Sequence, residues 1–280
     1  MRTSSRLSVG IALFVLGMIW VPFSHAQNTI PDNATDQATP DKPTERVMPE
    51  GLTANLNVSF YSQYVWRGLE LSKDSLVIFP TATIGYKGFA LNLWVDLDTD
   101  FNNPPPGKDS EAKLQETDLT LTYNNTISPL KLDYTLGWIY YDTDGFYGDS
   151  PTHNQELFAN LALDLPLNPT VGVYSEIETG SAWYTSFNLS HSFNVYKDWS
   201  LDVGGWVSYL YNKAEDFSAF HDGNLWTGLT IPLNSYFSVT PKIQYSFPLS
   251  SDSDDRLKAN SFNGNDAQFL YGGIIFDLTF

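Results

Sequence analysis

The chain alternates apolar and polar residues with a period of two from Gly51 to its last residue. Successive side chains of a β-strand point to opposite faces, so each such segment has one apolar face and one polar face. The chain ends on the same alternation, with apolar residues at Ile274, Phe276, Leu278 and Phe280. Repetition of this pattern to the carboxyl terminus is typical of a β-barrel with lipid outside and water inside.

About twelve segments of membrane-spanning length follow this pattern, so the sequence predicts an all-β fold, a transmembrane antiparallel up-and-down β-barrel. An even strand number returns the carboxyl terminus to the side where Gly51 begins. We expect strands at 52–65, 76–86, 89–98, 116–123, 130–141, 156–165, 171–178, 183–193, 201–211, 225–231, 237–247 and 269–280. Lipid offers no hydrogen-bond partner to a free strand edge, so the last strand must pair with the first.

The connections between these segments alternate in length. Lys87-Gly88 and 195–199 are short, whereas 66–75, 212–223 and 248–266 are long. Short turns on one side and long loops on the other match outer-membrane barrels, in which the short side is periplasmic. A soluble periplasmic β-sandwich is the alternative, but its strands seldom alternate so uniformly.

The first fifty residues differ from the rest. Residues 1–26 combine two arginines, an apolar run and a small-x-small site at Ser24-His25-Ala26, which predicts a signal peptide with Gln27 as the first mature residue. Residues 27–50 are rich in proline and polar residues, which predicts a disordered periplasmic tail. The barrel would then occupy residues 51–280, in a Gram-negative cell outer membrane.

The charge of the chain excludes several classes of partner. After removal of residues 1–26, thirteen basic and thirty-two acidic residues remain, a net charge of −19. Such a chain is unsuited to nucleic acid, whose phosphates need Lys and Arg. It has no cysteine and therefore no disulfide framework. No motif calls for a cofactor or a metal; Asp142-Thr143-Asp144-Gly145 and Asp252-Ser253-Asp254-Asp255 only resemble fragments of calcium loops.

Acidic residues fall at inward positions near the expected outer mouth. We expect a pore-lining vestibule formed by Asp96, Asp98, Glu116, Asp118, Glu156, Glu176 and Glu178. A ring of carboxylates in a narrow water path favours cations, although solvated strand ends without any role in transport would look the same. Arg67 and Lys242 are the expected counter-charges. Arg67 would pair with Asp98 or Glu116, or lie in a solvated loop.

Aromatic residues also fall at inward positions. They include Trp94, Phe158, Tyr174 and Trp206. Their rings would either stack on a passing sugar or nucleoside or fill a barrel too small to be open, because twelve strands lie between the filled eight-stranded barrels and the wide porins.

Two further function classes stay open beside a channel for small polar or cationic solutes. A lipid hydrolase or deacylase would need a nucleophile with a base, for which His153 and His221 in outer loops are candidates, but no Gly-x-Ser-x-Gly elbow occurs. A non-conducting structural or adhesive barrel would have its lumen blocked by aromatic side chains. We predict that the protein is not an enzyme.

Two resemblances refine this prediction. The alternation that ends at Phe280 resembles the carboxyl-terminal signal read by the barrel-assembly machinery, which would make that machinery a partner beside outer-membrane lipid and lipopolysaccharide. The run Phe60-Tyr61-Ser62-Gln63-Tyr64-Val65-Trp66-Arg67-Gly68, followed by Tyr86-Lys87-Gly88-Phe89, resembles the opening of the TorF-type porin family. That resemblance covers the first third of the barrel and implies an outer-membrane pore of unassigned substrate, and it transfers no catalytic residue to this chain.

Overall fold

The computed structural model describes residues 51–101, 111–144, 152–178, 180–262 and 264–280. Within these residues, twelve antiparallel strands close into one barrel, in which each strand pairs with its neighbours in the chain and β14 pairs with β1. The predicted fold class is confirmed. The expected signal peptide (1–26) and tail (27–50) lie outside the described residues.

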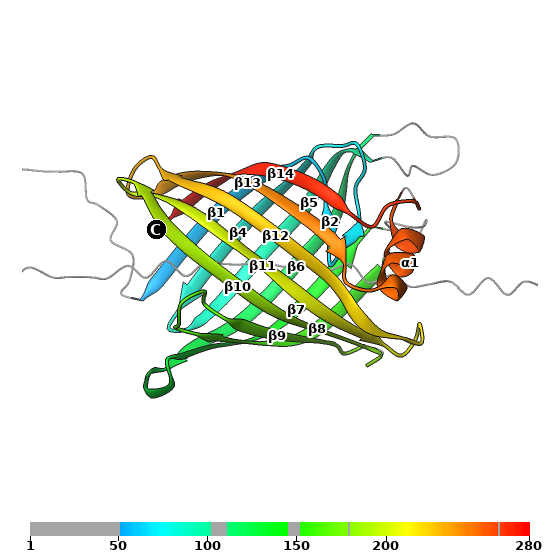
Figure 1. Cartoon of the computed structure of the whole chain (residues 1–280). Helices are drawn as coiled ribbons and strands as arrows, with labels where there is room; N and C mark the ends of the chain where they lie inside the picture. The colour runs from blue at the N-terminus through cyan, green and yellow to red at the C-terminus, as the bar shows by residue number, and fades with distance from the viewer. Residues whose placement is uncertain (1–50, 102–110, 145–151, 179, 263) are drawn as a thin grey trace, which may run out of the picture.

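The strands lie tilted to the barrel axis, with the carboxyl terminus at one end and the helix α1 at the other (Figure 1). The barrel strands are β1 Leu52–Tyr61, β4 Val77–Tyr86, β5 Phe89–Phe101, β6 Glu111–Ile127, β7 Leu132–Thr143, β8 Thr152–Leu163, β9 Thr170–Glu176, β10 Ala182–Tyr196, β11 Trp199–Asn212, β12 Phe217–Pro232, β13 Phe237–Pro248 and β14 Phe269–Thr279. Closure places Leu56 opposite Leu278 and Phe60 opposite Ile274.

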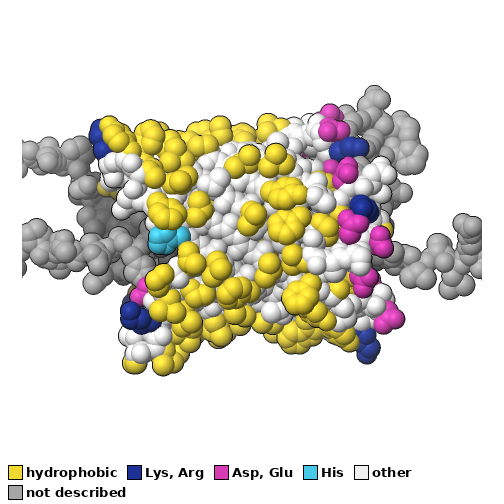
Figure 2. Space-filling view, in the orientation of Figure 1, with side chains coloured by type: hydrophobic (Ala, Val, Ile, Leu, Met, Phe, Trp, Pro, Cys, Tyr) yellow, Lys and Arg dark blue, Asp and Glu magenta, His cyan; other side chains and the backbone are white. Residues whose placement is uncertain are grey.

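The period-two pattern sets which side chains face outward. On β5, Leu91 and Leu93 are exposed on the outside, whereas Asn92, Trp94 and Asp96 are buried inside. Apolar side chains are spread over much of the visible face of the barrel, and charged ones gather at its two ends (Figure 2). At the carboxyl terminus, Ile274, Phe276 and Phe280 are exposed and Leu278 is half-buried, and the backbone of Phe280 hydrogen-bonds that of Ala54.

The connection between β1 and β4 departs from the sequence prediction. The first strand ends at Tyr61 rather than at residue 65, and the chain then forms a hairpin of β2 (Val65–Trp66) and β3 (Leu69–Glu70). The sequence predicts an outer loop at residues 66–75. Instead Tyr64, Trp66, Leu69 and Leu71 are buried, and they form one apolar core with inward residues of the barrel wall.

Two other segments also differ from the prediction. Residues 212–223 are not a long loop, because β11 runs to Asn212 and β12 begins at Phe217, leaving a turn between them. The connection 248–266 contains the helix α1, Ser251–Asn260, whose amino end is capped by Ser250. None of the described helices is long and apolar enough to cross a membrane.

Two of the β-bulges at the α1 end of the barrel change which side chains face the lumen. Between β5 and β6 the register skips Gln115, so that Gln115 and Glu116 are both fully buried. Between β11 and β12, the register shift opposite Ser208 leaves His221 and Asp222 both buried. A bulge adds one residue to one strand and re-aims the side chains there. These two bulges supply polar side chains that strict alternation would have placed outside.

Candidate functional site in the barrel lumen

The β2–β3 hairpin turns on Arg67 and Gly68. Trp66 pairs with Leu69, so the turn has two residues, and both have positive φ, 42° at Arg67 and 80° at Gly68. This is the backbone of a type I′ turn, which suits glycine at the second position but is costly for a residue with a side chain. The turn therefore holds Arg67 at the tip of the hairpin in a conformation that needs support from its surroundings.

That support comes from the barrel wall. The guanidinium nitrogens of Arg67 donate to both carboxylate oxygens of Glu156 on β8, at 3.3 and 3.1 Å. Its carbon atom Cζ lies 4.7 Å from the ring centroid of Trp66, 5.0 Å from that of Tyr174 and 4.0 Å from that of Tyr184. A two-pronged ion pair with flanking aromatic rings is the arrangement that arginine makes best. Arg67 thus faces inward as predicted, but it pairs with Glu156 and not with Asp98 or Glu116, and it is not a solvated loop residue.

The ionisation of Arg67 follows from this environment. Burial by itself lowers the pKa of the guanidinium, but the charge and hydrogen bonds of Glu156, together with the nearby Tyr184 and Tyr141, more than offset this effect, and the pKa is raised above its ordinary value. Arg67 is therefore charged. A buried ion pair of this kind is costly to break from one side, because the remaining charge has no other partner.

Tyr64 anchors the start of the hairpin. Its hydroxyl donates to Glu116 Oε2 on β6 at 2.9 Å, and its ring packs on Phe79 and Trp94, with centroids 5.2 and 5.7 Å away. Burial, together with the nearby carboxylates, raises the pKa of Tyr64 well above its usual value, so the hydroxyl stays a neutral donor. The backbone N–H of Leu71 returns to the carbonyl of Tyr64 at 2.8 Å, which closes the hairpin on itself.

The helix α1 covers the hairpin from the end of the barrel. Leu257 is fully buried, and a Cβ added at Gly68 would lie 2.9 Å from Leu257 Cδ1 and 3.0 Å from Asp222 Cβ. Arg256 fixes the helix to the β11–β12 turn through Glu215, at 2.7 and 3.0 Å. The hairpin is therefore held between the barrel wall and α1, and Gly68 has no room for a side chain.

Four carboxylates lie near Tyr64, and we call them the acidic cluster: Asp96, Glu116, Asp118 and Glu156. All four are buried. Asp96 is opposite Glu116 in the register, and Asp118 interacts electrostatically with the other three. Among the described residues, no N–H or hydroxyl donor reaches either carboxylate oxygen of Asp96 or Asp118. Buried carboxylates without donors are costly and attract positive charge.

Two other predicted vestibule residues, Asp98 and Glu176, adjoin the acidic cluster but have hydrogen-bond donors of their own, and Glu178 lies apart from it. Asp98 is buried but accepts from the backbone N–H of Asp100 at 3.0 Å, and Glu176 accepts from the backbone N–H of Ser181 at 3.2 Å. Glu178 is exposed beyond the end of β9, where it accepts from Gln155 Nε2 at 3.3 Å. The prediction that Glu178 lines the lumen is therefore wrong, because β9 ends at Glu176 and the chain turns outward.

The predicted lumen aromatics all lie inside, in three different settings. Trp94 packs on Phe79, with ring centroids 4.9 Å apart, and belongs to the core beneath the hairpin. Phe158 stacks on Tyr174 at 5.1 Å. Trp206 donates to Asp222 Oδ2 at 2.9 Å. Trp94 thus fills the barrel, whereas Tyr174 contacts a cation.

The end of the lumen near the carboxyl terminus is different. We call it the polar half, and its inward side chains are half-buried and include Asn55, Asn57, Asn160, Asp202, Thr230 and Asp277. Its carboxylates have neutral donors: Asp277 accepts from Asn55 at 2.9 Å, and Asp202 accepts from Thr230 at 2.9 Å. Lys242 lies near the middle of β13 with its Nζ 4.7 Å from the ring centroid of Trp226.

The candidate catalytic and metal-binding residues do not come together in one site. His221 is not in an outer loop but buried on β12, where its Nδ1 lies 3.0 Å from Ser253 Oγ, and that hydroxyl also donates to the His221 carbonyl at 2.6 Å. His153 lies on β8 with its ring stacked on Tyr140. The described part of the chain contains no group of three or more residues that could hold a metal ion. Asp252 to Asp255 form the first turn of α1 rather than a loop.

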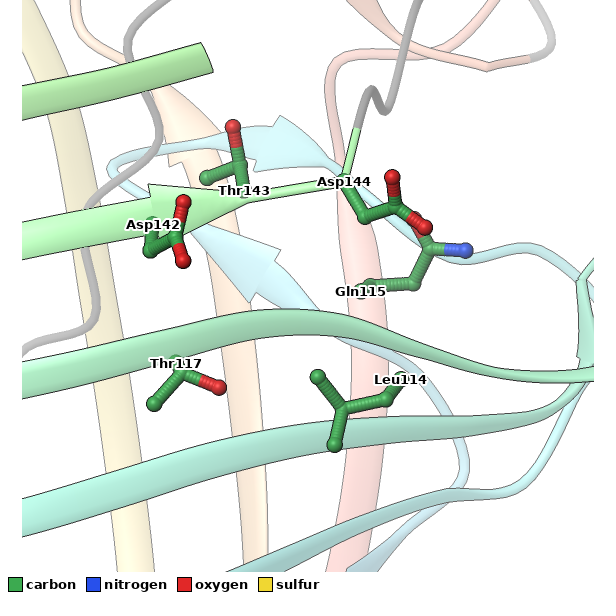
Figure 3. Close-up of a pocket in the computed structure, with 6 residues that line it drawn as sticks. All are labelled: Leu114, Gln115, Thr117, Asp142, Thr143 and Asp144. Atoms are coloured by element: carbon green, nitrogen blue, oxygen red, sulfur yellow. The ribbon is translucent and has the colours of Figure 1, made fainter. Parts of the chain in front are cut away.

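A small pocket lies at the end of the β6–β7 ladder (Figure 3). Leu114 and Thr117 line it from β6 and Asp142 from β7, and these side chains lie at the rim of the barrel rather than in the lumen. None of the residues that bind Arg67 or the Tyr64 hydroxyl lines this pocket, so it is separate from the site around Arg67.

Sequence reasoning missed Tyr184 and Asp222. The hydroxyl of Tyr184 donates to Asp222 Oδ1 at 2.9 Å while its ring contacts Arg67. Asp222 also accepts from Ser208 Oγ at 2.6 Å. The β11–β12 bulge hid Asp222, which the sequence pattern places in a loop. For the hairpin, the sequence offered one signal. Gly68 follows Arg67 between Trp66 and Leu69, and glycine suits the second position of a two-residue hairpin turn.

Comparison with known proteins yields similarity of overall form only. No family model matches the chain, and no curated protein matches it. A NanC porin resembles it with 8% identity and a TM-score of 0.46, over 80% of this chain and 98% of that one. An outer membrane channel from Pseudomonas putida F1 does so with 11% identity and a TM-score of 0.42, over 86% and 100%. OmpT, an outer membrane protein of Vibrio cholerae, does so with 8% identity and a TM-score of 0.37, over 82% and 98%. Similarity this low carries no argument about function, and the resemblance to TorF-type porins stays a prediction.

Proposed function

We propose that this protein is an outer-membrane channel for small polar and cationic solutes and that the β2–β3 hairpin closes it in the conformation described. Three features of the molecule support this proposal: an apolar exterior, an inward-folded hairpin, and an excess of negative charge in the lumen.

The exterior suits a hydrocarbon environment. Outward residues such as Leu93, Leu121 and Ile243 are 45%, 46% and 49% exposed, which would be costly in water over so much of the surface. Closure leaves no strand edge, so the backbone of the barrel needs no donor or acceptor from its surroundings. With the long β1–β4 and β13–β14 connections outside the cell, the carboxyl terminus faces the periplasm.

The charge of the lumen supports passage of cations. The acidic cluster places four carboxyl groups beside the single guanidinium of Arg67, so the described lumen holds more acidic than basic groups at this level, and these groups would ionise once water reaches them. In a narrow path of low dielectric constant, such charge concentrates cations and repels anions. The donor-free carboxylates of Asp96 and Asp118 are the observation on which the proposal chiefly depends.

The experiment is a reversal-potential measurement in planar bilayers. A variant with residues 65–70 replaced by a Gly-Ser linker opens the lumen, and in a KCl gradient it should prefer K⁺ over Cl⁻. Adding Glu116→Gln and Asp118→Asn should reduce this preference. Adding Glu178→Gln instead is the matched control, because that side chain is exposed outside the lumen, and it should leave the preference unchanged.

Anion preference in the linker variant would overturn the proposal. Absence of any conductance in that variant would favour a second function, a non-conducting structural barrel. One observation supports this alternative: the buried core of Tyr64, Trp66 and Leu71 fills one end of the lumen. A hydrolase has no comparable support, since the Ser253 hydroxyl is buried and bound to a backbone carbonyl.

A further inference from the structure

Arg67 occupies a pocket that the barrel wall builds by itself. Glu156, Tyr174 and Tyr184 come from the neighbouring strands β8, β9 and β10, and Tyr174 is opposite Tyr184 in the register. None of the three belongs to the hairpin. Together they offer one carboxylate for a two-pronged hydrogen bond and two aromatic rings for cation–π contact, which is a complete set of contacts for a planar guanidinium.

Two of the three wall residues, Tyr174 and Tyr184, are held in place by partners other than Arg67. Tyr184 donates to Asp222 at 2.9 Å, and the Tyr174 hydroxyl lies 3.4 Å from Asn160 Oδ1. The two rings meet edge to face with centroids 6.2 Å apart. The two rings should therefore keep their places when Arg67 leaves, and Glu156 is then the carboxylate that needs a new cationic partner, as a binding site for a cation requires.

The occupant, in contrast, is held under strain. Arg67 has a φ of 42°, a left-handed conformation that costs a residue with a Cβ about 1–2 kcal/mol. The hairpin thus brings a guanidinium to this pocket against the backbone preference of that residue. A free guanidinium compound would make the same contacts without that strain.

A second positive charge would also find partners. Asp118 interacts electrostatically with Glu156, and both of its carboxylate oxygens lack an N–H or hydroxyl donor among the described residues. Arg67 neutralises Glu156 but does not contact Asp118 or Asp96 through any described hydrogen bond. The pocket and the cluster together suit a ligand with a guanidinium at one end and a further cation at the other.

We propose that Glu156, Tyr174 and Tyr184, with the neighbouring carboxylate of Asp118, bind small dicationic solutes that carry a guanidinium group, and that Arg67 occupies the site as an internal competitor. This inference rests on the proposed function for the route by which solutes enter. Tyr174 and Asn160 are half-buried, and Asn160 belongs to the polar half, so we expect solutes to reach the pocket from that half.

Binding of agmatine, which carries one guanidinium and one ammonium, tests the inference directly. Arg67→Ala removes the competitor, and an internal ligand acts at a high effective concentration. By calorimetry on the purified full chain in detergent, Arg67→Ala should bind agmatine about tenfold or more tightly than the unaltered protein does. Putrescine, with two ammonium groups, should bind more weakly than agmatine.

Control variants separate this site from general attraction to an acidic barrel. Adding Glu156→Gln to Arg67→Ala should abolish the gain in agmatine affinity. Arg256→Ala also removes an arginine from an ion pair, but one on α1 with Glu215, and it should bind agmatine no better than the unaltered protein. If Arg67→Ala folds poorly, Arg67→Lys keeps a positive charge without the two-pronged bond and should show a smaller gain.

Stability provides an independent readout. Agmatine should raise the unfolding temperature of Arg67→Ala and leave that of the double variant unchanged. Equal affinity in Arg67→Ala and the unaltered protein, or equal binding of putrescine and agmatine, would overturn the inference. If the linker variant conducts but Arg67→Ala does not bind agmatine, this inference is wrong and the proposed channel function stands. Agmatine binding without conductance in the linker variant would sink the channel and leave the site.

Discussion

The two halves of the lumen solve the same problem in different ways. In the polar half, the carboxylates of Asp202 and Asp277 are half-buried and accept hydrogen bonds from neutral side chains on neighbouring strands. At the α1 end, the acidic cluster is fully buried, and its only described cationic partner is Arg67, supplied by a segment that does not belong to the barrel wall.

The difference shows what the barrel can do by itself and what it needs the hairpin for. A half-exposed carboxylate keeps much of its hydration, so short polar neighbours suffice. A buried carboxylate loses that hydration, so it either takes up a proton or requires a counter-charge. The barrel wall by itself therefore supplies the partners that the carboxylates of the polar half need. The acidic cluster at the α1 end takes its cationic partner, Arg67, from the hairpin.

The largest expected effect is on conductance. Replacing residues 65–70 by a Gly-Ser linker removes the buried Trp66 and Leu69 from the bore. We expect single-channel conductance in planar bilayers to rise at least about tenfold, since a twelve-stranded bore is wider than the eight-stranded ones that side chains fill. Replacing the four exposed residues 233–236 of the β12–β13 turn by a Gly-Ser linker is the control. Equal conductance of both variants would show that the hairpin does not close the bore.

The next effect is on stability and compares one carboxylate from each half. Glu156→Ala leaves Arg67 buried without its partner and should cost about 3–5 kcal/mol of unfolding free energy. Asp202→Ala removes acceptors of neutral hydrogen bonds at a half-buried site and should cost about 1 kcal/mol. Urea titration of the folded barrel in detergent measures both. Similar losses would mean that the two halves do not differ as described.

A smaller effect is expected at the hairpin turn. Gly68→Ala combines positive φ with a Cβ only 2.9 Å from Leu257 and should cost about 2–3 kcal/mol. Gly180→Ala is matched, because Gly180 also has positive φ but nothing within 4 Å of an added Cβ; it should cost about 1 kcal/mol. If the two variants unfold at the same urea concentration, Gly68 is not confined by α1.

The smallest effect concerns the attachment of α1. Arg256 and Glu215 are partly exposed, so Arg256→Ala should cost about 1 kcal/mol or less. High salt should reduce this cost by screening, whereas the cost of Glu156→Ala should barely change. Unfolding titrations at low and high NaCl check this contrast. If salt did not change the loss of unfolding free energy in Arg256→Ala, the ion pair of Arg256 would behave like a buried one, and the contrast would fail.

The sequence alone predicted the wall well and the hairpin poorly, for physical reasons. Alternation on β5 correctly placed Trp94 and Asp96 inward, because the side chains of a regular strand point alternately to its two faces. Residues 65–70 carry no such period, and their burial depends on partners such as Glu156 that are far away in the chain. The bulge at Gln115 and the one opposite Ser208 break the period where the site is built.

Cysteine labelling of the protein in lipid vesicles tests the central claim most directly, since the chain contains no cysteine of its own. We expect a water-soluble maleimide to label Asn57→Cys in the polar half rapidly. It should not label Leu93→Cys on the outer face or Leu71→Cys beneath the hairpin. Replacing residues 65–70 by the linker should expose position 71 and leave position 93 unlabelled. Rapid labelling at position 93, or at position 71 with the hairpin intact, would contradict a lipid-surrounded barrel closed by its own hairpin.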